Sequence, residues 1–65
     1  MNQLYFYRVS YEIHDLGVIR TVVVVASGTV EAQEKAISKI LYDDFDCLYR
    51  EDFTILSAEP YKEYH

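Results

Sequence analysis

Apolar and polar positions alternate along the first part of the chain. The two sides of residues 4–13 carry different sets: one has Tyr5, Tyr7, Val9, Tyr11 and Ile13, and the other has Leu4, Phe6, Arg8, Ser10 and Glu12. This period of two predicts a β-strand over 4–13. Residues 18–26 contain four consecutive valines and predict a second strand, one that offers apolar side chains to both faces of a sheet.

The segment HDLG between these strands is typical of a hairpin turn, because Gly17 adopts a positive φ at no steric cost. A three-residue loop over 15–17 would place Glu12 opposite Arg20, which is a favourable cross-strand charge pair. A two-residue loop would place Tyr11 opposite Arg20 and turn every side chain of the second strand to the other face. The charge pair favours the three-residue loop.

One helix is predicted over 30–42, with Thr29 as its N-cap. At 100° per residue its apolar stripe consists of Val30, Gln33, Ala36, Ile37, Ile40 and Leu41. An acidic loop follows over 43–51. A third strand is predicted over 52–59, ended by Pro60, and a polar tail over 60–65.

These elements predict one small α+β domain over 1–65 with the order β-β-α-β. A right-handed crossover brings the third strand beside the first, which gives a three-stranded, mainly antiparallel sheet of order 2-1-3 with the helix on one face. A chain of 65 residues is marginally stable without a disulfide, a metal or a partner subunit. Cys47 is the only cysteine, so no intrachain disulfide forms and self-association is expected.

The helix covers one sheet face and leaves the other open. With the three-residue loop, the apolar part of the open face is formed by Leu4, Phe6, Val22, Val24 and Ala26. A contiguous apolar patch of this kind marks an interface, here with a second copy or with another protein. The alternative is that the C-terminal tail folds back across the patch, with Tyr61 or Tyr64 as the plug.

The net charge of −5 lies entirely in the second half of the chain. It disfavours direct binding of nucleic acid and of anionic membranes. No stretch is apolar over the length of a bilayer and the N-terminus does not read as a signal peptide, so a cytoplasmic location is expected. Five acids cluster in the stretch DDFDCLYRED: Asp43, Asp44, Asp46, Glu51 and Asp52.

Two interpretations of this acidic cluster stay open. It is either a solvated loop that keeps the protein soluble, or a partner-binding surface that imitates nucleic-acid phosphates and blocks a basic cleft. The second interpretation would make the protein an inhibitor of the kind that phages and mobile elements carry.

Residues that could perform chemistry are sparse. His14 is predicted at a turn and His65 is the last residue, and neither is a rigid frame for catalysis. Cys47 follows Asp46, whose charge disfavours a reactive thiolate. No metal-ligand spacing and no phosphate-binding loop appears, so no metal, cofactor or catalytic residue is expected. The sequence therefore predicts a non-catalytic protein–protein interaction module that associates with itself, rather than an enzyme.

Overall fold

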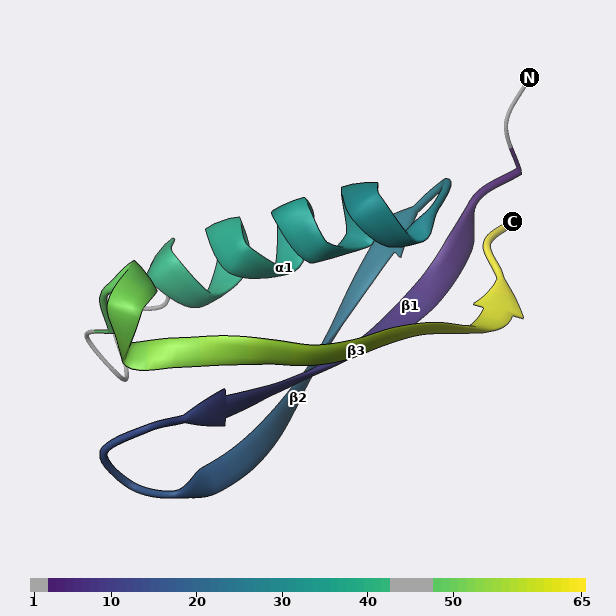
Figure 1. Ribbon diagram of the computed structural model, residues 1–65. Coiled ribbons are helices and arrows are strands. Elements are labelled where there is room, and N and C mark those ends of the chain that lie inside the picture. Colours follow the sequence, from purple (N-terminus) through teal and green to yellow (C-terminus); the bar gives the residue numbers. More distant parts are fainter. Residues whose placement is uncertain (1–2, 43–47) are drawn as a thin grey trace.

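In the part of the chain that the structure describes, a helix lies across one face of a three-stranded sheet (Figure 1). The computed structural model describes residues 3–42 and 48–65. Its elements follow in the order β1 (Tyr5–Ile13), β2 (Val18–Ala26), α1 (Thr29–Tyr42), the 3₁₀ turn η1 (Arg50–Asp52) and β3 (Phe53–Glu63). The strand order is β2-β1-β3, and both outer strands run antiparallel to β1. The predicted α+β fold and sheet order are confirmed.

The register between β1 and β2 is the one that the sequence disfavoured. Ile13 pairs with Val18 and Tyr11 pairs with Arg20, so the prediction of Glu12 opposite Arg20 is wrong. The connecting turn occupies 14–17, where Gly17 has a φ of 63° and its N–H donates to the Ile13 carbonyl at 2.9 Å. A charge pair near the surface contributes at most about 1 kcal/mol, so it does not decide the register, and the observed pairing packs Val24 and Ala26 against the helix.

This register exchanges the two faces of β2, so that Val22, Val24 and Ala26 turn to the covered face and Ile19, Val23 and Val25 to the open one. Val24 and Ala26, predicted on the open face, are 8% and 0% exposed and lie opposite Tyr7 and Tyr5. Val22 is half-buried and packs against the same core. Of the five residues predicted to form the open apolar patch, Phe6 is on the open side of β1, whereas Leu4 precedes the strand and is 37% exposed.

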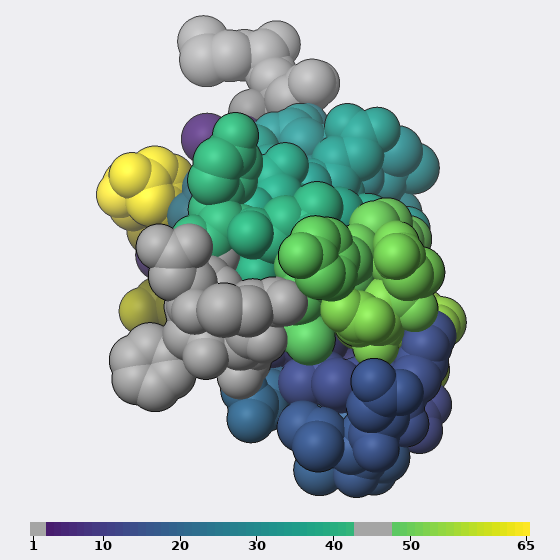
Figure 2. Space-filling view, turned by 90° about the vertical axis from the view of Figure 1, so that its left-hand side faces the viewer, coloured from purple at the N-terminus to yellow at the C-terminus, as the bar shows by residue number. Residues whose placement is uncertain are grey.

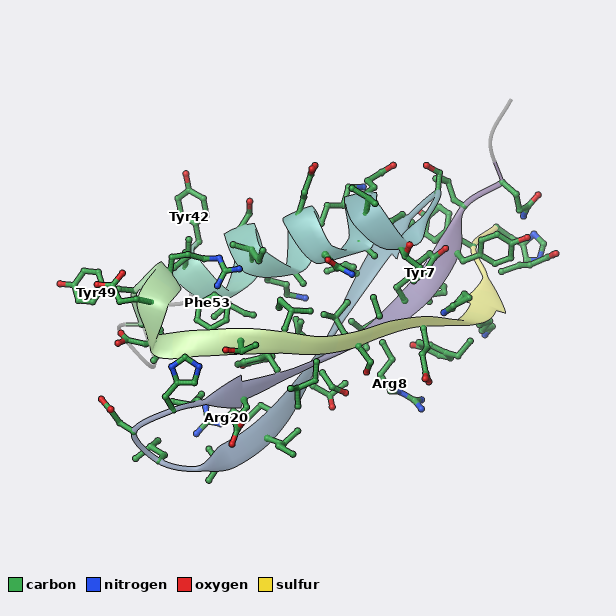
Figure 3. All side chains as sticks on the ribbon, in the orientation of Figure 1. Tyr7, Arg8, Arg20, Tyr42, Tyr49 and Phe53 are labelled. Atoms are coloured by element: carbon green, nitrogen blue, oxygen red, sulfur yellow. The ribbon has the colours of Figure 1, made fainter. Side chains whose placement is uncertain are left out.

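The core lies between the sheet and α1 and has two parts. At the start of α1, Tyr7, Val9, Val24 and Ala26 pack with Ala32 and Ala36; at its end, Tyr11, Ile13 and Phe53 pack with Ile40. Figure 3 shows Tyr7 and Phe53 pointing into this layer from β1 and β3. Two alanines in the contact face let the helix lie close to the strands.

The helix is therefore rotated relative to the predicted stripe. Its buried residues are Ala32, Ala36 and Ile40, whereas Val30 is 68% exposed. Ala36 and Ile40 belong to the predicted stripe; Ala32 does not, because alanine contributes little to a hydrophobic pattern although its small side chain lets the helix lie close to the sheet. The first backbone hydrogen bond runs from Ala32 N–H to the Gly28 carbonyl at 2.9 Å, so Gly28, not Thr29, is in the N-cap position.

β3 is longer than predicted. It continues through Pro60 to Glu63, so residues 60–63 are strand and not a polar tail. Proline is accommodated because β3 is an edge strand, where an N–H is dispensable. Two register shifts against β1 leave Leu56 and Tyr61 as additional residues on β3. Beyond the strand, Tyr64 N–H donates to the Leu4 carbonyl at 2.9 Å, which holds the two chain ends together.

Candidate interaction surface

The face of the sheet opposite α1 is the candidate site, and it is called the open face below. Its side chains form four rows across β2, β1 and β3: Val25–Phe6–Lys62, Val23–Arg8–Glu59, Thr21–Ser10–Ser57 and Ile19–Glu12–Thr54. Figure 3 shows Arg8 pointing away from the helix on this side.

An aromatic cluster occupies the end of the open face near the chain termini. The Phe6 ring lies 5.4 Å from the Tyr64 ring and 6.2 Å from the Tyr61 ring, measured between centroids. The Arg8 guanidinium lies over the Tyr61 ring, 4.6 Å from its centroid, in a cation–π contact. Tyr61 and Tyr64 thus partly cover Phe6, as the tail alternative required, although Tyr61 belongs to β3 and not to a tail.

The remainder of the open face keeps apolar side chains in solvent. Ile19 is 64% exposed and Val23 is 38% exposed, both on β2, and the bulge residue Tyr61 is 47% exposed. The predicted three-residue loop would have turned both of these β2 side chains toward the helix, whereas the alternative two-residue loop places them on the open face.

The charges of the open face balance. Arg8 and Lys62 are opposed by Glu12 and Glu59, so this face is neutral although the chain has a net charge of −5. The row between Arg8 and Glu12 carries only the hydroxyl side chains of Thr21, Ser10 and Ser57. Two neutral faces that each carry both signs add no net like-charge repulsion where they meet, in contrast to the acidic parts of the molecule.

His14 and Thr54 form the one histidine–hydroxyl pair among the interactions of the described residues. His14 Nε2 and Thr54 Oγ1 are 2.6 Å apart, beside the β1–β2 turn. Both side chains are exposed. A base next to a hydroxyl resembles part of a nucleophilic site, but activation needs a third group and a frame that excludes water. The pair is better explained as a link between the turn and β3, parallel to the bond from His14 N–H to the Asp52 carbonyl at 2.9 Å.

Only part of the predicted acidic partner-binding surface lies within the described residues. Asp43, Asp44 and Asp46 lie outside the described residues, as does Cys47. The Asp52 carboxylate accepts a hydrogen bond from Tyr49 N–H at 2.8 Å and closes η1, while Glu51 is exposed. Figure 2 shows the green segment that contains η1 lying between the end of α1 and the β1–β2 hairpin. Asp52 therefore has a structural role.

A shallow groove of about 280 Å³ lies at the end of β3 and is lined by Tyr5, Pro60, Tyr61, Lys62 and Glu63. It lies at the low end of the volumes that hold small ligands. Four of its five lining residues are exposed, so it offers little desolvated surface to a ligand. His65 Nε2 lies 3.7 Å from a Glu63 carboxylate oxygen near the same end.

Within 3–42 and 48–65, no group of three or more histidine, cysteine or acidic side chains is placed to hold a metal ion. In the same residues, no helix is both long enough and apolar enough to cross a bilayer. No protein-family model matches the chain, and no curated protein and no solved structure is significantly similar to it.

Proposed function

We propose that the protein is a non-catalytic interaction module that associates with itself through the open face. The observation that carries this proposal is the exposure of Ile19 and Val23 on a sheet face that α1 does not cover. Their burial against a second copy would contribute about 25 cal/mol for each Å² of apolar surface removed from water. The core of a chain this small gives only marginal stability, and association with a second copy would add to it.

The face itself supports self-association over capture of a strongly charged partner. Its four charged side chains cancel, and isologous pairing requires a surface that complements itself. A partner with a basic cleft would instead be attracted to the acids outside the open face. Three of those five acids lie outside the described residues; of the other two, Asp52 accepts a hydrogen bond within η1 and Glu51 is exposed.

The experiment is the solution mass by light scattering over a hundredfold range of concentration, for the unmodified chain and for Ile19→Thr/Val23→Thr. Threonine keeps the β-branched shape and removes apolar surface. We expect a dimer for the unmodified chain and a mass close to one chain for the double variant. Val30→Thr is the matched control, because Val30 is 68% exposed on the helix and not on the sheet.

A monomer at every concentration for the unmodified chain would refute the proposal. So would a dimer whose dissociation constant is unchanged by the double substitution, because another surface would then hold the pair together.

A further inference from the structure

We propose that two copies pack open face to open face about a two-fold axis that crosses the strands along the row Thr21–Ser10–Ser57. This inference rests on the proposed function and adds the orientation of the pair and the residues that select it. In such a pair the two β1 strands run antiparallel across the interface. A residue two positions before Ser10 then faces a residue two positions after Ser10 in the partner.

The central strand is complementary to itself under this operation. Arg8 and Glu12 lie two positions before and two positions after Ser10, and both point to the open face. Each Arg8 would therefore face the partner's Glu12, and the operation generates this ion pair twice. Arg8 stacks on Tyr61 at 4.6 Å, which leaves the edge of the planar guanidinium free to donate to a carboxylate.

The second strand shows the same complementarity in apolar form. Val23 lies beside Arg8, and Ile19 lies beside Glu12. Val23 would therefore face the partner's Ile19, and these are the side chains left 38% and 64% exposed in the single chain. Between the two charged rows, the small side chains of Ser10, Thr21 and Ser57 let the sheets approach each other near the axis.

A different orientation of the pair is unfavourable. An axis parallel to β1 would stack Arg8 on the partner's Arg8 and Glu12 on the partner's Glu12. It would also place Val23 against the partner's Glu59, since β2 would then lie over β3. Like charges opposed across an interface weaken binding strongly. The order of charges along β1 thus selects the axis that crosses the strands.

Charge reversal tests this orientation directly. Arg8→Glu places two carboxylates opposite each other at each of the two contacts in the dimer. Glu12→Arg places two cations opposite each other there. We expect each variant alone to dissociate at least about tenfold more readily than the unmodified chain. An equimolar mixture of the two variants should form a mixed dimer, and the double variant Arg8→Glu/Glu12→Arg should recover the original dimer. Sedimentation velocity measures all four samples.

Glu34→Lys is the control for the overall charge, because it makes the same change as Glu12→Arg at an exposed helix position. It should leave the dimer intact, and circular dichroism shows whether each variant is folded. If single reversals leave the dissociation constant unchanged, or if folded single variants do not pair on mixing, the orientation is wrong although self-association stands. If the unmodified chain is monomeric throughout, the proposed function fails and this orientation fails with it.

Discussion

Lys39 Nζ donates a hydrogen bond to the Val23 carbonyl across 3.1 Å, and thereby joins α1 to the outer edge of β2. Lys35 makes the equivalent bond to the Val25 carbonyl at 2.7 Å, while forming an ion pair with Glu31 at 3.1 Å. Unpaired edge carbonyls invite the addition of another strand, and lysine is a residue that natural proteins use against it. Both lysines therefore protect this edge while they orient the helix.

Replacing Lys39 by methionine keeps much of the aliphatic stem and removes the donor. We expect the free energy of unfolding to fall by about 1 kcal/mol, because one exposed hydrogen bond is lost. We also expect larger species to appear in light scattering as concentration rises. Urea denaturation measures the first effect. Lys39→Arg, which keeps both the charge and a donor at the same position, is the control and should change neither quantity appreciably.

The hairpin register can be checked with one substitution made at two adjacent positions. Val24 is 8% exposed under α1, and Val23 is 38% exposed on the open face. Threonine at Val24 buries a hydroxyl, so we expect Val24→Thr to cost about 1–3 kcal/mol. Val23→Thr should change the unfolding free energy of the monomer by less than about 0.5 kcal/mol. Denaturation at low protein concentration would give the opposite order if the three-residue loop were correct.

The two glycines should respond in opposite directions to serine. Gly17 has a φ of 63°, where a side chain is strained, so Gly17→Ser should destabilise the protein by about 1 kcal/mol. Gly28 is in the N-cap position and a Cβ there has nothing within 4 Å. Serine is a preferred N-cap, so Gly28→Ser should stabilise the protein by a few tenths of a kcal/mol. Thermal unfolding measures both, and equal shifts would contradict this explanation.

Acid should weaken the start of the helix through Glu31. The Ser27 hydroxyl, 2.7 Å from the Glu31 carboxylate, and then Lys35 lower the pKa of this carboxyl below its ordinary value of 4.5. A lowered pKa in the folded state stabilises the protein above pH 4.5, and that stabilisation is lost as the pH falls through the folded value.

Glu31→Gln should therefore be less stable than the unmodified chain near neutral pH, and the difference should shrink on acidification. Urea denaturation between pH 7 and about pH 3 measures it, with Glu34→Gln as the control at a neighbouring helix position. A stability difference that does not change with pH would indicate that the carboxylate charge is unimportant there.

The elements and their order could be predicted because each has a strong local signal. The period of two over β1, the run of valines in β2 and the single apolar helix leave few arrangements of 65 residues. The sheet order followed from the short connections. Self-association rests on the same reasoning and stays a prediction.

The register and the site residues could not be predicted with the same security. Four consecutive valines give the same apolar pattern to both faces, so a shift by one residue changes little in the sequence pattern. The choice then depended on a cross-strand pair of Glu12 and Arg20, and a charge pair near the surface contributes at most about 1 kcal/mol. The structure decides through Ala26, which is fully buried beside the alanines of α1, and so places Val23 rather than Val24 on the open face.

The two bulges of β3 determine where the sheet stops growing. Eleven residues of β3 run beside nine of β1, and the surplus at Leu56 and Tyr61 interrupts the even spacing of backbone donors and acceptors along the free side. A regular strand that added to β3 would fall out of register with the backbone donors and acceptors of β3 within a few residues. With lysines on the opposite edge, both lateral directions are closed to polymerisation. The proposed pairing through the open face would then end at a discrete pair, rather than continue as a fibre.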